Sequence, residues 1–297
     1  MFAPDQYHLV DFGDGRKLER FGAALLDRPS PAAEGAEIAD PDVWGTATAR
    51  FELGKGGKGQ WTEAASSAGV GSEPWTVRHG EAQLLMQLNP SGNVGIFPEQ
   101  ASNWEWIGDQ VRQCRNGLSS RRPRVLNLFA YTGGASLAAA AAGAEVTHID
   151  SSAPTVAWAK RNAGASALDD LPIRWIVEDA VKFVERECRR ANRYDGIIAD
   201  PPTYGHGPKG RPFKFGQHVD ELMERCAELL GTTDATHRFL LFSCHAPGVG
   251  PTAARSVISR VLPDADDVRL TARPLLLESV DGRQLSAGVS ARWSQTQ

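Results

Sequence analysis

The chain has 297 residues, of which 41% are hydrophobic and 23% charged, and its formal net charge is −4. This length supports one large domain, or one domain of ordinary size with a smaller module. No apolar run reaches the roughly 18 residues needed to span a bilayer, and the four scattered cysteines, without a C-x-x-C pair, argue against a disulfide framework or a zinc cluster. We therefore expect a cytoplasmic protein with no membrane partner and no metal, in which any nucleic-acid contact comes from local basic patches.

Residues 1–95 carry Gly-rich turns, such as FGDGR and NPSGNVG, between stretches of partial alternation such as WTVRHGEAQLLMQL. Alternation bounded by turn residues is typical of short antiparallel strands, so we predict a small β-rich N-terminal module here. The segment EQASNWEWIGDQVRQCRN (99–116) predicts a helix. We expect residues 96–123, which include this helix and the first three residues of the basic stretch RRPR (121–124), to connect the module to the rest of the chain.

From residue 124 onward, short apolar runs alternate with helical patterns. The runs are RVLNLF (124–129), AEVTHID (144–150), IRWIVED (173–179), YDGIIAD (194–200) and RFLLFSC (238–244). Strands that alternate with helices predict a parallel sheet. Two later runs, 267–277 and 285–293, are separated by a turn too short for a helical crossover and should pair antiparallel. The predicted fold is α/β, with a seven-stranded, mostly parallel Rossmann-like sheet and an antiparallel C-terminal hairpin.

The ends of the predicted strands are where a ligand is expected, because open α/β sheets bind ligands at the carboxyl ends of their strands. After the first strand, Gly133 and Gly134 in NLFAYTGGASL allow a tight turn and a close approach of backbone to ligand, or form an ordinary strand-to-helix turn. Asp150, at the end of the second strand, can accept both hydroxyls of a ribose. Asp179, after the third, can accept from an adenine amino group, cap the next helix, or do both.

The fourth strand ends at Asp200 and is followed by PPTYGHGP. Successive strands that each end in an acid predict a ligand with a ribose, an amino-bearing base and a cationic centre. S-adenosylmethionine (SAM) has all three. NAD would require a phosphate cradle, and the loop after the first strand lacks the G-x-G-x-x-G pattern. The expected cofactor is therefore SAM.

The stretches LNLFAYTGGASLAAAAAGAEVTHID, WIVEDAVKF and YDGIIADPP resemble the successive motifs of class I SAM-dependent methyltransferases. The similarity is closest to the bacterial subfamily that includes the 23S rRNA cytosine-C5 methyltransferases, and GNVGIFPEQASNWEWI resembles the segment that precedes their methyltransferase domain. It extends from about Trp75 to Trp293 and implies a methyltransferase domain over 124–297. It also implies cofactor contacts from Phe97, Gln100, Phe129, Ala130, Tyr131, Thr132, Gly133, Asp150, Ser151, Asp179, Ala180, Asp200 and Pro201.

The same resemblance implies an RNA substrate, with rRNA as the first choice. Residues 1–70 show no counterpart of the RNA-binding PUA-type domain that is usual in the subfamily. In DPPTY the aromatic stands one position later than in the DPPY motif of amino-methylating enzymes, where it stacks on a flipped base. The candidate substrate residues are Pro202, Tyr204, His206 and Lys209.

The candidate catalytic residues are Asp200 and Cys244. Cytosine C5 is not nucleophilic, so methylation there requires a thiolate that adds at C6. Cys244, in FSCHAP, stands where the cytosine-C5 relatives carry SCS, although it can also be a small buried hydrophobe. A nitrogen-directed methyltransferase acting on a base, a protein or a small molecule needs no thiolate. An NAD(P)-dependent oxidoreductase and a non-catalytic SAM- or RNA-binding factor also stay open, and so does the oligomeric state.

Overall fold

The computed structural model of the chain describes residues 1–54, 59–63, 74–118, 120–205, 213–230, 235–262 and 268–296. Its contacts divide the chain into two compact units. The first unit consists of Met1–Ala101 and Leu276–Ala287, and the second of Ser102–Leu275 and Gly288–Gln297. The predicted domain boundaries near residues 95 and 123 stay predictions. All five strands that are predicted to carry strand-end site residues belong to the second unit.

The first unit is rich in short strands, as the N-terminal sequence predicts. Its five-stranded sheet contains, in order, β1 (Tyr7–Gly13), β2 (Arg16–Phe21), β3 (Ala24–Pro29), β4 (Ala49–Leu53) and β5 (Gly59–Glu63), and a separate hairpin contains β6 (Trp75–His79) and β7 (Ala82–Met86). Neighbouring strands pair antiparallel except β3 and β4, which pair parallel. A parallel pair requires a crossover, which η1 (Pro31–Ala33) and α1 (Pro41–Trp44) supply. The module is therefore β-rich, as predicted, but it is not uniformly antiparallel.

The second unit contains a seven-stranded sheet in the order β10-β9-β8-β11-β14-β16-β15. The strands are β8 (Arg124–Leu128), β9 (Glu145–Asp150), β10 (Ile173–Val177), β11 (Gly196–Ala199), β14 (His237–Cys244), β15 (Val268–Glu278) and β16 (Gln284–Thr296). The five strands from β10 to β14 are parallel, and β16 is antiparallel to β14. This architecture confirms the predicted fold. The order along the sheet reverses between β8 and β11, where doubly wound sheets bind their ligands.

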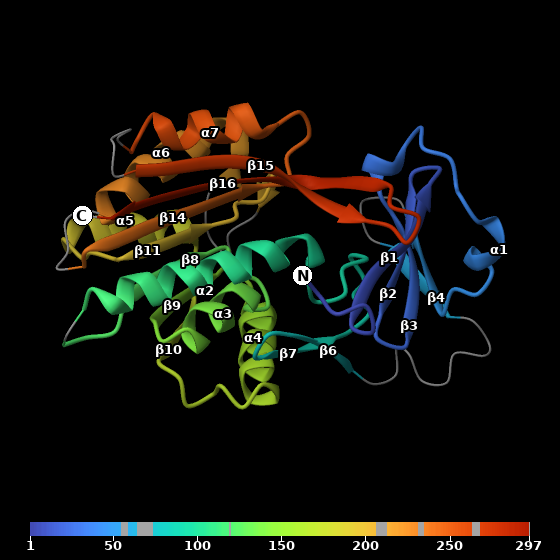
Figure 1. Ribbon diagram of the computed structural model, residues 1–297, viewed down its shortest axis with the longest axis horizontal. Helices are drawn as coiled ribbons and strands as arrows, with labels where there is room; N and C mark the ends of the chain where they lie inside the picture. The colour runs from blue at the N-terminus through green and yellow to red at the C-terminus, as the bar shows by residue number, and fades with distance from the viewer. Residues whose placement is uncertain are drawn as a thin grey trace. The chain divides into compact units, whose positions relative to one another are not determined.

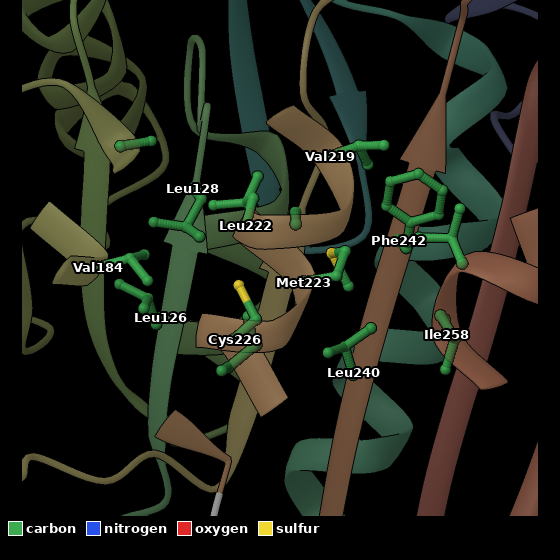
Figure 2. Close-up of a cluster of buried hydrophobic side chains, with 14 of the residues drawn as sticks. Leu126, Leu128, Val184, Val219, Leu222, Met223, Cys226, Leu240, Phe242 and Ile258 are labelled. Atoms are coloured by element: carbon green, nitrogen blue, oxygen red, sulfur yellow. The ribbon is translucent and has the colours of Figure 1, made fainter. Parts of the chain in front are cut away.

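Helices cover both faces of this sheet (Figure 1). On one face lie α2 (Ala101–Asn116), α3 (Gly134–Ala141) and α4 (Ala153–Ala165), and on the other α5 (Ala180–Arg189), α6 (Phe215–Leu229) and α7 (Pro251–Ser259). Figure 2 shows Leu222 and Met223 of α6 between Leu128 of β8 and Phe242 of β14, and all four side chains are buried. Because the central strands are covered on both sides, their sequences are continuous apolar runs instead of alternating ones.

Two kinds of feature were not found among the described residues. No described helix is both long and apolar enough to cross a bilayer. Within the same residues, no group of three or more His, Cys, Asp or Glu side chains is placed to hold a metal ion. The four cysteines are free thiols, and Cys114, Cys226 and Cys244 are buried.

The packing of β11 against β14 leaves no room for a side chain at Gly196. A Cβ atom there would lie 2.2 Å and 2.3 Å from two ring carbons of Phe239, which is fully buried and packs edge-on against Trp106. We expect Gly196→Ala to lower the free energy of unfolding by about 1–3 kcal/mol, because the ring cannot move aside. Gly164→Ala in α4, where the added Cβ meets open space, is the control and should raise it by about 0.5 kcal/mol. Urea denaturation measures both, and an unchanged midpoint for Gly196→Ala would contradict the tight packing.

Candidate active site

The carboxyl ends of the parallel strands meet at one edge of the sheet, which we call the carboxyl edge. In the strand registers, Leu128 at the end of β8 pairs with Ile149 of β9 and with Ala199 of β11. Asp150 and Asp200 are the next residues along their strands, so both leave the sheet at one level. They lie on either side of β8, next to the point where the strand order reverses. The predicted strand-end acids are therefore brought to the same edge.

Two more predicted residues reach this edge from the outer strands. Val177, the last residue of β10, pairs with Asp150, so Asp179 follows two residues beyond that level. Phe242 of β14 pairs with Ala199, which places Cys244 two residues beyond it at the end of β14. The register thus places side chains from four strands along the carboxyl edge.

The loop that follows β8 has a strained backbone. Phe129 and Tyr131 have φ angles of 55° and 49°, and Gly133 has a φ angle of 91°. The left-handed region costs a residue with a side chain about 1–2 kcal/mol, whereas glycine enters it freely. At Gly134 a Cβ atom would lie 2.5 Å from the ring of Trp104. The Gly-Gly pair is therefore required both by backbone conformation and by close packing, and the strain at the two aromatic residues is typical of a loop that binds a ligand.

Asp150 fixes this loop to the end of β9. Its Oδ2 accepts a hydrogen bond from the backbone N–H of Tyr131 at 2.9 Å, and its Oδ1 accepts one from Ser152 at 2.9 Å. Burial raises the pKa of Asp150, and the two backbone donors oppose that shift. An ionised carboxylate has about four acceptor positions, so two bonds leave capacity for further donors. The hydroxyls of a ribose are such donors, and the residues present therefore fit an adenosyl group at this place.

A buried polar network beneath the loop was not predicted from the sequence. Asn127 Nδ2 donates to Ser136 Oγ at 2.9 Å, Ser136 Oγ lies 2.9 Å from His148 Nδ1, and Asn162 Nδ2 donates to the carbonyl oxygen of Thr132 at 2.8 Å. All five residues are buried, and burial lowers the pKa of His148 to about 3, so its ring is neutral. The signal in the sequence was a polar residue inside each of two apolar runs, LNLF and THID.

The turn after Asp200 is fixed to the start of α6. The carbonyl oxygen of Thr203 accepts a hydrogen bond from the N–H of Phe215 at 3.1 Å. Tyr204 is 52% exposed and pairs with Lys214 in a short ribbon made of β12 (Tyr204–Gly205) and β13 (Phe213–Lys214). This ribbon holds an aromatic ring at the surface, four residues after the acid at the carboxyl edge.

Cys244 is almost completely buried, with 1% of its surface exposed. Burial raises the pKa of its thiol, the backbone N–H of Ala246 opposes the shift through a 3.2 Å hydrogen bond to Sγ, and the negative charge of Asp200 raises the pKa further. Asp200 Oδ1 in turn lies 3.6 Å from Nε2 of His245. The thiol, the carboxylate and the imidazole therefore form one cluster, in which the thiol is protonated at neutral pH.

The other predicted cofactor residues of the second unit also follow the strand ends. Asp179 caps α5, because its Oδ1 accepts a hydrogen bond from the N–H of Lys182 at 3.1 Å. This is one of the two roles expected for it. Ala180 begins the helix and is buried, Ala130 and Pro201 are buried, and Ser151 and Pro202 are half-buried.

Four predicted residues are not part of this geometry. Phe97 precedes η3 (Pro98–Gln100), and Gln100 is its last residue and is buried. Both belong to the first unit, and their contact with a cofactor stays a prediction. His206 and Lys209 lie outside the described residues.

The chain resembles curated proteins over part of their length. It is 30% identical over 173 residues to "Ribosomal RNA large subunit methyltransferase K/L" of Alcanivorax borkumensis, which covers 57% of this chain and 22% of that protein. It is 28% identical over 178 residues to "Ribosomal RNA large subunit methyltransferase I" of Aeromonas salmonicida, which covers 60% of this chain and 39% of that protein. The chain thus spans less than half of either relative.

Solved structures and a family profile match more of the chain. The crystal structure of the SAM-dependent methyltransferase from Agrobacterium tumefaciens has a TM-score of 0.86 and 35% identity, and covers 97% of this chain and 90% of its own. SMU.776 complexed with SAH has a TM-score of 0.73 and 18% identity, and covers 98% of this chain and 76% of its own, a likeness of fold alone. The family described as S-adenosylmethionine-dependent methyltransferase matches residues 59–290, which confirms the predicted enzyme class and methyl donor. The chain belongs to the S-adenosylmethionine-dependent methyltransferase family.

Proposed function

We propose that this methyltransferase modifies large-subunit ribosomal RNA. The observation that carries the proposal is that two differently named groups of relatives, K/L and I, are both ribosomal RNA large subunit methyltransferases by name. The surface ribbon at the carboxyl edge supports it. Tyr204 offers an exposed ring and Lys214 lies directly opposite it, and an aromatic ring beside a cation suits single-stranded RNA, in which bases stack and phosphates need positive charge.

At the cofactor end of the site, the residues of the chain would bind SAM and orient its methyl group toward the acceptor. SAM, when bound, supplies a methyl group that its sulfonium makes electrophilic. Methyl transfer of this kind depends mostly on position and on a correctly charged pocket. We assign the ribose hydroxyls to Asp150, the adenine amino group to Asp179 and the cationic end of the cofactor to Asp200. The backbone of residues 129–133 closes the site beneath the adenosyl group.

The first candidate for the acceptor is cytosine C5, with Cys244 as the nucleophile. Its thiolate would add to C6, which makes C5 nucleophilic toward the methyl group. A base would then take the proton from C5, and the electron pair of the Sγ–C6 bond would return to sulfur, which restores the thiolate. Because the Cys244 thiol is protonated in the resting site, its proton must first pass to a base. Asp200 is close enough to shift the pKa of the thiol, and His245 lies 3.6 Å from Asp200.

The second candidate is a ring or amino nitrogen of a base. It is favoured by the same burial of Cys244, which has 1% of its surface exposed and a raised pKa. A nitrogen acceptor already carries its own lone pair, so no thiolate is needed and Cys244 would only fill space in the core. In this case the Asp200 carboxylate would hold the amino group of the base, and Tyr204 would stack on its ring.

The role of Asp150 can be tested by its effect on cofactor affinity. Asp150→Ala removes a charge-assisted acceptor and should weaken SAM binding by about 1.5–3 kcal/mol, or roughly 10–150-fold. Isothermal titration calorimetry with SAM measures this directly. Asp109→Ala on the exposed side of α2, where Asp109 pairs with Arg112, removes the same charge and should leave affinity unchanged. Equal affinity of Asp150→Ala and Asp109→Ala would show that the ribose lies elsewhere.

The substitution Cys244→Ala distinguishes methylation at cytosine C5 from methylation at a nitrogen of a base. If Cys244 is the nucleophile, this change should lower methyl transfer to ribosomal RNA by about 10⁴-fold or more, because the C5 route has no other nucleophile, while SAM affinity stays unchanged. Mass spectrometry of the nucleosides should then show 5-methylcytidine as the wild-type product. Cys188→Ala, at a half-buried thiol in α5, is the control. Full activity of Cys244→Ala with a nitrogen-methylated product would reject the thiolate route.

The pH dependence gives an independent test of the same step. Burial raises the pKa of Cys244 above its usual range, so the thiolate fraction is small at neutral pH and grows tenfold for each pH unit until the pH reaches that raised pKa. Single-turnover transfer should therefore rise steadily from pH 7 through the ordinary thiol pKa of about 8.5 without levelling off there. A rate that is flat between neutral pH and that value contradicts the C5 route.

A further inference from the structure

The second unit contains a polar cavity at the edge of the sheet opposite to the carboxyl edge. Its volume is about 390 Å³, and its lining comes from α2, the start of β14, the start of β15 and the end of β16. The described lining residues are Trp106, Gln110, Gln113, His237, Arg269, Thr271, Arg292, Ser294 and Thr296. Two of them are arginines and none is an acid. Nothing in the proposed methyl transfer uses this cavity.

Arg292 is a buried cation with neutral partners. Only 7% of its surface is exposed, its Nε and Nη2 donate to Asn103 Oδ1 at 3.0 Å and 2.6 Å, and Nη2 also donates to the carbonyl oxygen of Ser102 at 2.7 Å. Its guanidinium lies over the ring of Trp106, 5.4 Å from the centroid. Within the described part of the chain, no carboxylate lies within ion-pair distance of Arg292, and Nη1 has no acceptor. A buried charge without a counter-ion is costly, so an anion in the cavity would relieve it.

The neighbouring side chains are held in fixed positions. His237 is 3% exposed, with Nδ1 2.9 Å from Thr296 Oγ1 and Nε2 2.9 Å from Gln110 Oε1. Because the amide oxygen of Gln110 can only accept, His237 must donate from Nε2 and accept at Nδ1 from the Thr296 hydroxyl. This assignment leaves the amide N–H groups of Gln110, which also lines the cavity, as donors. The lining is therefore organised before any ligand arrives.

Arg269 adds a second positive charge at the mouth of the cavity. It is an exposed residue of β15, and it forms no ion pair with any residue that the structure describes. Arginine matches phosphate oxygens with paired N–H donors. Two arginines, an amide and hydroxyl groups around a space of this size are the donor set that a phosphate group requires.

We propose that this cavity is a binding site for a phosphate group, and that the phosphate belongs to the backbone of the RNA substrate. The second part of the proposal rests on the proposed function, because it gives the RNA substrate a contact outside the methyl-transfer site. The cavity would then fix the position of the RNA without reading its sequence, as phosphate contacts generally do. A free phosphate-bearing small molecule would use the same donors, so the test distinguishes the two sources.

The test compares Arg269→Gln with Arg174→Gln. Arg174 is exposed on β10, at the opposite edge strand of the sheet, so the control removes the same charge far from the cavity. Line broadening in ³¹P NMR, with inorganic phosphate as the probe, should show binding to the wild type and to Arg174→Gln. Arg269→Gln should weaken it about tenfold or more. Wild-type SAM affinity in both variants would verify that they fold.

A short single-stranded RNA is the second probe, measured by fluorescence anisotropy at several salt concentrations. If the site holds RNA phosphate, Arg269→Gln should reduce the slope of log K against log salt by about 0.7, the value of one contact to a single strand, more than Arg174→Gln does. Weaker phosphate binding with unchanged RNA binding would support the site and assign it to a free small molecule. No phosphate binding in the wild type, or equal binding by the two variants, overturns the proposal. Absence of rRNA methylation would reject the proposed function and leave the phosphate result standing.

Discussion

The carboxyl edge of this protein depends on one carboxylate that joins two loops. Asp150 receives the backbone N–H groups of Tyr131 and Ser152, and so connects the end of β9 to the strained loop after β8. The left-handed conformations of Phe129 and Tyr131 cost free energy, and the hydrogen bond from Tyr131 N–H to Asp150 helps to offset that cost. The same carboxylate keeps lone pairs for a ligand, so organisation of the loop and the proposed recognition of the ribose would depend on the same atoms.

Buried polar groups occur at two places in the large sheet, and they differ in kind. Beneath the loop after β8, Asn127, Ser136 and His148 are neutral and hydrogen-bonded in a chain, although Nε2 of His148 is buried without a hydrogen-bond partner among the described residues. On β16, in the cavity beside α2, Arg292 keeps its charge with neutral partners only, among the residues described. A neutral network carries no net charge to balance, whereas a buried cation gains from an anion. This contrast is why the second location, and not the first, is proposed as an additional binding site.

The choice between a carbon and a nitrogen acceptor depends on the environment of the Cys244 thiol. Cys244 lies at the strand end where a nucleophile would be needed, yet burial and the nearby Asp200 both hold its proton in place. The same negative charge that would receive a cationic cofactor therefore works against a thiolate. A C5 route requires the substrate or a base to change that balance, and a nitrogen route does not. The end of β14 thus determines which of the two reactions the site can perform.

The sequence by itself determined the strands of the large sheet, its helices and its carboxyl edge. Continuous apolar runs, helical periodicity and an acid at the end of a run are local patterns, and each can be recognised without knowing which segments become neighbours. It predicted the roles of Gly133 and Asp179 for the same reason. The tertiary structure alone decided the parallel pairing of β3 with β4, the burial of Cys244 and the network around His148. It also brought Gln110 of α2 against His237, 127 residues further along the chain, at the cavity that Arg269 and Arg292 line. Such contacts depend on which strands become neighbours, and the sequence pattern of each segment carries no record of its partner.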